Sequence, residues 1–330
     1  MILTTKTSVG QYDIVIKRGV LNNLKEHLNL NRKVLVVTDS GVPEIYAKTI
    51  AAQCSEGYVF TFKQGEESKN FDTYKAILQE MVKNGFTRSD CVVAVGGGVT
   101  GDMAGFAAAS FMRGIDFYNI PTTVLSQVDS SIGGKVAIDF CGVKNIVGAF
   151  YPPKAVIIDA DTLNTLPKRQ ISNGLSEALK MAATFDKELF NHFLNEELNI
   201  DYIIEQSLRL KKAVVEEDEK EKGIRKVLNF GHTVGHAIES VNLGNLYHGE
   251  CVGLGMLYLC SDEVKPRIKK ALQRLNLPTS CEIDADKIIE FMSHDKKKAG
   301  NSISVIWVEE IGSYEIKKMN LDELKEVILK

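Results

Sequence analysis

Short apolar segments that alternate with helix-like segments most constrain the fold of the first half of the chain. Lys33–Asp39 and Cys91–Val95 each contain a continuous apolar run, which is typical of strands buried on both faces in a parallel sheet. Helical patterns at 43–53 and ending near residue 84 supply the crossovers that parallel strands need. The alternation therefore predicts an α/β, Rossmann-like parallel sheet with helices on both faces. Further strands are expected at 57–62, 116–120 and 155–158, after a strand pair within 1–18.

The hydrophobic pattern changes after Leu166-Pro167, where helical periods replace strands. We therefore expect two domains: an α/β N-terminal domain at 1–166 and a mainly α-helical C-terminal domain at 167–330. The helices expected in the second domain are 173–185, 187–196, 200–216, 225–240, 249–262, 264–274, 285–293 and 321–329, with one late strand pair at 302–308 and 313–316.

Composition narrows the class of protein. The net charge of −3 over 330 residues gives no reason to expect a nucleic-acid partner. The six cysteines form no CxxC pair and fit reduced, buried thiols. Neither a signal peptide nor an apolar run of about 18 residues is apparent. We therefore expect a cytoplasmic protein that does not associate with membranes.

A glycine-rich segment follows the expected strand Cys91–Val95. Gly96–Gly101 fits the pattern G-x-G-x-x-G and precedes a segment of small residues with a helical pattern, 104–111. Glycines at such a turn let the backbone approach a pyrophosphate, and the helix start offers N–H donors. A dinucleotide site is the favoured interpretation, although this is not the first strand–helix turn, where a standard Rossmann domain has it. Asp102 is either a helix cap or a ribose ligand.

Four polar residues in the second half recur at helical spacing: Arg225, Asn229, His232 and His236. Steps of four, three and four residues place them on one face of a single expected helix. A solvated face is the ordinary alternative, but such faces favour Lys and Glu, so a metal or catalytic face is preferred. Gly231 and Gly235 suit close packing against a neighbouring helix and would be costly on an exposed one.

A second metal interpretation uses residues from separate segments. His232, His248 and Glu177 form a possible His₂–carboxylate set of the kind that holds catalytic zinc. Sequence spacing does not establish this set, because Glu177 and Lys180 at i, i+3 also fit a simple intrahelical ion pair. Elsewhere, Thr122 and Thr123 offer hydroxyls after a strand, and Lys135 and Lys144-Asn145 lie in expected glycine loops that suit either solvent or an anionic ligand.

Taken in order, these motifs resemble the 3-dehydroquinate synthase family of sugar phosphate cyclases over about residues 60–300. The segments that carry the resemblance are Gly96–Asp102, Pro121–Thr123, Asp129–Lys135, Lys144-Asn145, Gly148–Tyr151, Gly174–Lys180, Asp218–Glu221, Arg225, Leu228–Glu239, His248–Glu250 and Asp295–Lys297.

The resemblance implies an enzyme, a phosphorus–oxygen lyase of the shikimate pathway of aromatic amino acid biosynthesis. It would convert 3-deoxy-D-arabino-heptulosonate 7-phosphate to 3-dehydroquinate and phosphate. The steps would be transient oxidation by NAD, phosphate elimination, re-reduction and intramolecular aldol closure. One divalent metal, Zn²⁺ or Co²⁺, and a homodimer are also implied.

By the same resemblance, Glu177, His232 and His248 are the metal ligands. The implied NAD site lies in segments 64–69, 98–102, 122–123 and 162–165; its residues are Asp39, Glu66, Lys69, Gly97, Gly98, Val99, Gly101, Asp102, Thr122, Thr123, Lys135, Lys144, Thr162 and Thr165. The residues implied for phosphate are Lys135, Asn145, Arg225, His236 and Lys297, with Arg113 reaching in from a partner subunit. Asp129, Lys180, Lys211 and Asn229 would orient hydroxyls and the carboxylate, and His236 would carry protons.

Two positions depart from the family pattern: the stretch Phe140-Cys-Gly-Val before Lys144, and Asn173 in place of a small residue. The alternatives are a sister cyclase, such as a 2-deoxy-scyllo-inosose or valiolone synthase, and a metal-dependent polyol dehydrogenase of the glycerol dehydrogenase type. A dehydrogenase needs no site that binds a substrate phosphate, so the cluster of basic residues disfavours this alternative. A non-catalytic NAD-binding protein would need no metal set.

Overall fold

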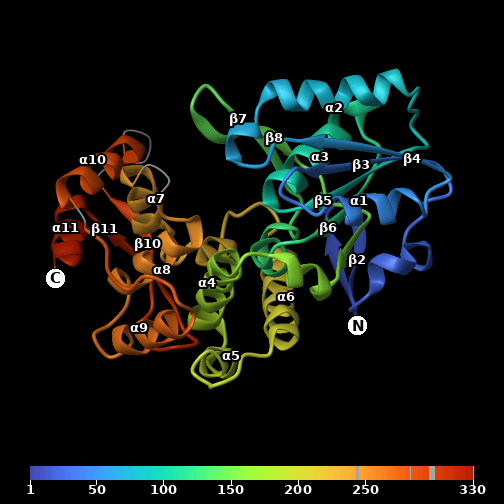
Figure 1. The fold of residues 1–330 in the computed structure, drawn as a ribbon. Helices are drawn as coiled ribbons and strands as arrows, with labels where there is room; N and C mark the ends of the chain where they lie inside the picture. Colours follow the sequence, from blue (N-terminus) through green and yellow to red (C-terminus); the bar gives the residue numbers. More distant parts are fainter. Residues whose placement is uncertain (243–244, 283, 297–301, 330) are drawn as a thin grey trace. The chain divides into compact units, whose positions relative to one another are not determined.

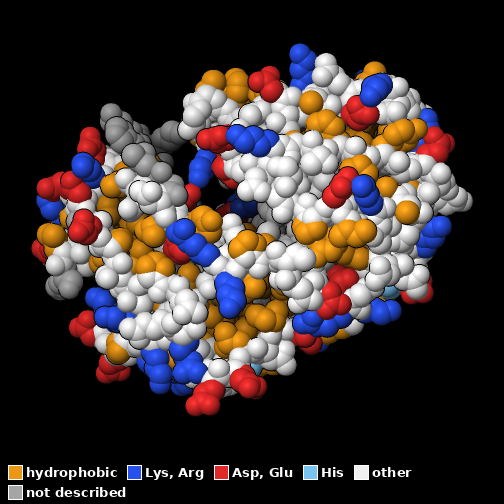
Figure 2. Space-filling view, in the orientation of Figure 1, with side chains coloured by type: hydrophobic (Ala, Val, Ile, Leu, Met, Phe, Trp, Pro, Cys, Tyr) orange, Lys and Arg blue, Asp and Glu red, His pale blue; other side chains and the backbone are white. Residues whose placement is uncertain are grey.

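The computed structural model describes residues 1–242, 245–282, 284–296 and 302–329, with the backbone alone for 293–296. The chain divides into two compact units, Met1–Pro167 and Lys168–Lys330 (Figure 1). On the face drawn in Figure 2, acidic and basic side chains both occur over each unit. In the part of the chain that is described, every helix is too short or too polar to cross a bilayer.

A seven-stranded sheet forms the centre of the first unit, with strand order β1-β2-β9-β6-β5-β3-β4. All neighbours are parallel except β1 and β2. This confirms the predicted parallel sheet. The strands are β1 (Ile2–Thr7), β2 (Gly10–Ile16), β3 (Lys33–Asp39), β4 (Glu56–Phe62), β5 (Cys91–Gly96), β6 (Asp116–Pro121) and β9 (Ala155–Ile158).

Alternate residues of β3 belong to different hydrophobic cores, which shows that both faces of the sheet are covered. Val34 and Val36 pack with residues of α1 (Glu44–Ala51) and η1 (Val20–Glu26). Leu35 and Val37 pack on the other face with residues of α2 (Phe71–Lys83) and α3 (Gly98–Ser110). The continuous apolar run of β3 therefore reflects burial on two sides. Short turns η2 (Glu66–Ser68), η3 (Phe111–Arg113), η4 (Ser126–Ser130) and η5 (Ala160–Thr165) connect these elements.

One expectation for this unit was wrong: Lys135, Lys144 and Asn145 lie in strands, not in glycine loops. β7 (Lys135–Phe140) and β8 (Val143–Phe150) form an antiparallel hairpin in which Phe140 pairs with Val143. The two turn residues, Cys141 and Gly142, have φ of 52° and 76°. Two positive φ values in a two-residue loop match the twist of a hairpin. The unusual stretch Phe140-Cys-Gly-Val is thus the hairpin turn.

The second unit is mainly helical, as expected. Its helices are α4 (Lys168–Phe185), α5 (Lys187–His192), α6 (Ile200–Glu217), α7 (His232–Val241), α8 (His248–Tyr258), α9 (Lys265–Arg274), α10 (Ala285–Lys296) and α11 (Leu321–Leu329). A 3₁₀ turn, η6 (Ile224–Asn229), precedes α7, and β10 (Ile303–Trp307) pairs antiparallel with β11 (Glu315–Met319).

The single helix expected at 225–240 is interrupted. η6 ends at Asn229, Phe230 is extended with φ −54° and ψ 131°, and Gly231 has φ 76°. A left-handed residue breaks the helix, and glycine adopts this conformation without steric cost. Arg225 and Asn229 therefore precede α7, and the prediction of one continuous four-residue face was wrong. His232 and His236 remain together on α7.

Candidate active-site residues

The glycine segment of the first unit lies where β5 leads into α3. Gly98, Val99, Gly101 and Asp102 lie in the first turn and a half of α3, which starts earlier than expected. No described side chain caps this start, so Asp102 is not the helix cap. Uncapped N–H groups at a helix start suit a phosphate. A Cβ at Gly97 would lie 3.3 Å from Thr123 Cγ2, so the loop fits closely against its neighbours.

Hydroxyl and carboxylate groups expected at the NAD site follow the carboxyl ends of β3, β5 and β6. Asp39, the last residue of β3, accepts a hydrogen bond from Thr100 Oγ1 at 2.8 Å. Because these strands are direct neighbours, their ends share one edge of the sheet. Thr122 is buried there, and Thr123 Oγ1 contacts Ser126 Oγ at 2.5 Å. In η5, Thr162 Oγ1 donates to the Asp159 carbonyl and Thr165 Oγ1 lies 3.0 Å from Tyr46 Oη.

Lys69 joins several predicted residues into one network. Its buried ammonium lies 2.6 Å from Asp102 Oδ2 and 3.8 Å from Glu66 Oε1, and it donates to Asn145 Oδ1. Burial raises the pKa of Asp102 to about 6 in spite of the adjacent ammonium. The structure therefore brings predicted NAD residues and one predicted phosphate residue, Asn145, together in this unit.

The remaining predicted residues of this unit lie around the same loop or at the surface. A pocket is lined by Gly97, Gly98, Gly101, Asp102 and Lys135, among others. Asp129 lies in η4, and the exposed Lys144 lies in β8. Arg113 is also exposed, with a φ of 68°.

In the second unit, three helices bring the predicted metal ligands together. Glu177 lies within α4, His232 begins α7 and His248 begins α8. Glu177 Oε1 lies 3.8 Å from His232 Nε2 and 3.4 Å from His248 Nε2. Tetrahedral ligands about 2.1 Å from a cation are about 3.4 Å from one another. These atoms therefore have nearly the spacing that one small cation requires.

The contacts of Glu177 further support a cation at this place. The side chain is 1% exposed, and its Oε2 accepts from Lys180 Nζ at 2.5 Å. Its Oε1 has no hydrogen-bond partner among the described residues. A buried carboxylate oxygen without a partner is costly. A divalent cation bound by Oε1 and the two imidazoles would satisfy it.

Electrostatics favour the same set. Burial works against ionisation of Glu177, yet Lys180 and both imidazoles hold its pKa well below the usual range. Burial and the Lys180 charge lower the pKa of His232 to about 3, so this ring is neutral and able to bind a metal. Burial lowers the pKa of His248, but the nearby carboxylates of Glu177 and Glu239 outweigh it and raise the pKa to about 9, so a cation would have to displace a proton from this ring.

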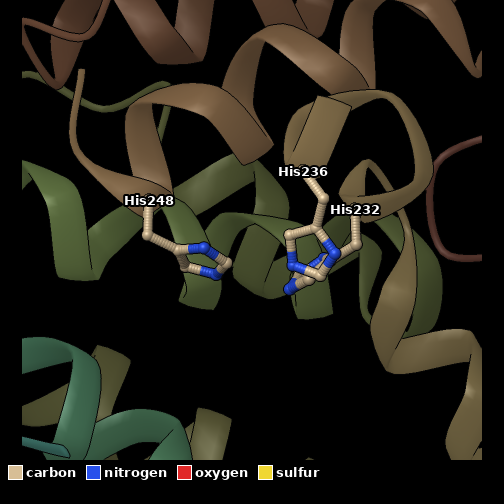
Figure 3. Close-up of side chains that lie close together, drawn as sticks. All are labelled: His232, His236 and His248. Atoms are coloured by element: carbon tan, nitrogen blue, oxygen red, sulfur yellow. The ribbon is translucent and has the colours of Figure 1, made fainter. Parts of the chain in front are cut away.

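His236, one turn after His232, also faces this group (Figure 3). Its ring centre lies 5.1 Å from that of His232 and 5.5 Å from that of His248. One nitrogen from each of the three rings falls within 4.8 Å of the others. The two histidine pairs considered from the sequence, His232 with His236 and His232 with His248, therefore belong to one cluster of three imidazoles. His236 is exposed whereas Glu177 is buried, so His236 borders the site on its open side.

Glycines set the spacing of the two histidine helices. A Cβ at Gly255 of α8 would lie 2.0 Å from the Gly231 carbonyl oxygen, and a Cβ at Gly235 would lie 2.9 Å from the Cys251 carbonyl. This confirms the close packing predicted for Gly231 and Gly235. The start of α8 is fixed separately, because Asn173 Oδ1 accepts from the Gly249 N–H at 2.6 Å. The departure at Asn173 therefore has a structural role beside His248.

The polar residues before α7 are held by an acidic turn that the sequence interpretation left without a role. Asp218 accepts backbone N–H groups of residues 222, 223 and 225, and the Arg225 guanidinium donates to the Glu219 carbonyl at 2.5 Å. Asn229 Nδ2 donates to Glu221 Oε1 at 2.8 Å. The segment Asp218–Glu221, which belongs to the motifs of the family resemblance, contains these acidic residues. Lys211 is buried on α6, and Lys297 lies outside the described residues.

Comparisons with known proteins agree with this arrangement. Residues 59–173 match the family model of the 3-dehydroquinate synthase N-terminal region, and residues 174–298 match that of the C-terminal region. The 3-dehydroquinate synthase of Campylobacter concisus (strain 13826) is 41% identical over 343 residues, covering 99% of this chain and 97% of that protein. The corresponding protein of Clostridium botulinum (strain Alaska E43 / Type E3) is 40% identical, covering 95% and 97%.

Solved structures of sugar phosphate cyclases share the fold. A 2-deoxy-scyllo-inosose synthase complexed with carbaglucose-6-phosphate, NAD⁺ and Co²⁺ superposes with a TM-score of 0.89 at 25% identity, covering 99% of each chain. The 2-epi-5-epi-valiolone synthase of Streptomyces hygroscopicus, with NAD⁺ and Zn²⁺ bound, gives 0.87 at 25% identity over 96% of each chain. The sequence matches span both units at far higher identity, and this chain belongs to the 3-dehydroquinate synthase family.

Proposed function

We propose that this chain converts 3-deoxy-D-arabino-heptulosonate 7-phosphate to 3-dehydroquinate and phosphate, with NAD and one divalent cation as cofactors. The observation that carries the proposal is the buried Glu177 oxygen that faces Nε2 of His232 and of His248. Sister cyclases are less favoured, because their solved members share 25% identity with this chain. The dehydroquinate synthases share about 40%.

The residues present fit both cofactors. Glu177, His232 and His248 would hold Zn²⁺ or Co²⁺, the ions bound in the two cyclase structures. The start of α3 would take the NAD pyrophosphate, with Asp39, Lys69, Asp102 and the threonines at 122, 123, 162 and 165 around it. When bound, NAD provides a transient hydride acceptor and the cation polarises a substrate hydroxyl.

Side chains of this protein would bind and orient the substrate. Lys135, Asn145, Arg225 and His236 are proposed for the phosphate, and Asp129, Lys211 and Asn229 for hydroxyls and the carboxylate. Lys180 keeps Glu177 ionised through their 2.5 Å contact. We therefore propose two roles for Lys180: it stabilises the metal-binding carboxylate and it contacts a substrate hydroxyl. His236 borders the histidine group and is exposed, which suits a residue that carries protons to and from a substrate.

A homodimer is also proposed, with Arg113 contributed by the partner. Several large apolar side chains near the hairpin are about half exposed, which is unusual for a surface that faces only water. They are Phe71, Met112, Phe140, Val143, Ile146 and Phe150. Light scattering coupled to gel filtration tests this, and a monomer at micromolar concentration would contradict it. We place the enzyme in the reducing cytoplasm.

The reaction itself is tested with purified protein, heptulosonate phosphate, a catalytic amount of NAD⁺, and Zn²⁺ or Co²⁺. The expected result is one phosphate and one dehydroquinate per substrate, with no net NADH. Glucose 6-phosphate serves as the control substrate and is expected to be inert. Accumulation of NADH would indicate a dehydrogenase, and turnover of glucose 6-phosphate would indicate a sister cyclase.

A further inference from the structure

The two histidines of the metal set present the same nitrogen to Glu177 because each holds its other nitrogen elsewhere. Nδ1 of His232 lies 3.2 Å from the Phe230 carbonyl oxygen. Nδ1 of His248 lies 3.0 Å from Glu239 Oε2. In both rings Nε2 faces Glu177 Oε1. The second contact uses a side chain, Glu239, to which neither the motifs nor the proposed mechanism gives a role.

These contacts fix the tautomer of each ring. A carbonyl oxygen and an ionised carboxylate only accept hydrogen bonds, so Nδ1 of each ring carries the proton. Nε2 is then the nitrogen that would provide a lone pair to a cation, and in both rings it faces Glu177 Oε1. Rotating the His248 ring about its bond to Cβ would break the bond to Glu239. The carboxylate thus holds both the tautomer and the orientation of the ring.

The position of Glu239 on α7 makes this contact specific. His232, His236 and Glu239 follow at i, i+4 and i+7, so they share one face of α7. The Glu239 side chain is 21% exposed, and the His248 side chain is 34% exposed. The hydrogen bond that His248 Nδ1 donates to Glu239 therefore ties a partly exposed ring to α7.

We propose that Glu239 is a positioning residue that orients His248 for the divalent cation. The inference rests on the proposed function, because it concerns the metal set of that site. Carboxylates behind a histidine ligand typically contribute 10- to 100-fold in metal affinity. Loss of Glu239 is expected to weaken metal binding by about that factor and to leave the fold intact.

The test compares Glu239→Ala and Glu239→Gln with the wild-type protein. Zn²⁺ affinity is measured on metal-free protein by competition with a chromophoric chelator, and the visible absorption of bound Co²⁺ reports the coordination geometry. Glu239→Ala is expected to raise the Kd for Zn²⁺ by about 10- to 100-fold and to change the Co²⁺ spectrum. In Glu239→Gln the amide oxygen still accepts from Nδ1 but without a charge, so a smaller increase is expected.

Glu205→Ala on α6 is the matched control, because it also removes a carboxylate that pairs with a side chain, Arg209, on its own unit. It should bind metal as the wild type does. A merely structural role of Glu239 would lower the Tm of the metal-free protein and leave the Kd and spectrum of the folded protein unchanged.

Wild-type Kd and spectrum in Glu239→Ala would overturn the inference. If that variant does not fold, an unchanged Kd and spectrum in Glu239→Gln would overturn it instead. Failure of the wild-type protein to bind Zn²⁺ or Co²⁺ would refute the proposed function as well, so the two failures are distinguishable.

Discussion

Gly255→Ala is expected to disable the metal site by pushing two helices apart. The new Cβ would lie 2.0 Å from the Gly231 carbonyl oxygen and 2.8 Å from the Gly235 nitrogen. Contacts of a Cβ below 3.0 Å essentially do not occur. The helices α7 and α8 must therefore separate by at least the difference, 1.0 Å, because both opposing atoms belong to the backbone and cannot rotate away.

This displacement acts directly on the ligands. His232 begins α7 and His248 begins α8, so separating the helices separates the two Nε2 atoms. Metal–ligand distances tolerate about 0.2 Å, and a misplacement of about 1 Å in an active site can cost roughly 100-fold in rate. Overpacking also destabilises by about 1–3 kcal/mol. We expect a rate of phosphate release about 100-fold lower, with substoichiometric metal after dialysis.

Gly253→Ala is the matched control on the same helix. Its new Cβ would meet Leu272 Cδ2 at 2.9 Å, which is the end of a side chain that can rotate. Replacing glycine by alanine raises helix propensity by about 1 kcal/mol in both variants. Any difference between the two variants in metal content, activity or Tm therefore reports the contact with α7. Metal content by mass spectrometry, phosphate release and Tm are measured for each. Wild-type metal content and activity in Gly255→Ala would show that helix spacing does not control the ligand geometry.

Three further predictions use single side chains. Lys180→Met removes the ammonium that pairs with the buried Glu177 carboxylate and is expected to destabilise the metal-free protein by about 3–5 kcal/mol at pH 7. Glu177 has a lowered pKa, so this stabilisation exists above its unfolded pKa and disappears at low pH; a penalty independent of pH in urea unfolding would contradict the reasoning. For Asp102, whose pKa is raised to about 6, stability is lost as the pH rises from about 4 through 6. Asp102→Asn should abolish this pH-dependent loss, which is at most about 3 kcal/mol in the free energy of unfolding. Identical dependence of the free energy of unfolding on pH in wild type and variant would refute this. His232→Ala should lose metal and activity together, whereas His236→Ala should keep metal and lose activity; equal loss of metal in both, measured after dialysis, would make His236 a ligand.

Much of the fold could be predicted because the hydrophobic pattern of single segments agreed with the way in which those segments pack. The run in β3 is apolar at every inner position, and both cores of the first unit use it. The break before α7 could not be read from spacing, since Arg225 and His232 keep the helical period across it. It depends on the φ of one residue, Gly231, and glycine occurs in both helices and turns.

The hairpin was missed for a similar reason. Its turn places Cys141 at positive φ, where Asn, Asp or Gly is expected, so the usual turn signal is missing. The proposed metal ligands follow from the family resemblance, whereas local spacing alone points as strongly to His232 with His236. Glu239 was quoted within a motif, but only the packing of α7 on α8 shows that it reaches His248. Contacts between elements remote in sequence are what a residue pattern does not contain.

The proposed metal ligands lie on three helices, α4, α7 and α8, and this arrangement has a thermodynamic consequence. A cation held by Glu177, His232 and His248 joins three helices whose ligands are separated by 55 and 16 residues in the chain. Because these ligands come together only when the unit is folded, the cation acts as a cross-link of the native state. Each tenfold rise in its concentration above the Kd then adds about 1.4 kcal/mol to the stability of the enzyme. The supply of metal would thus regulate how much folded enzyme persists in the cell, in addition to how much of it is active.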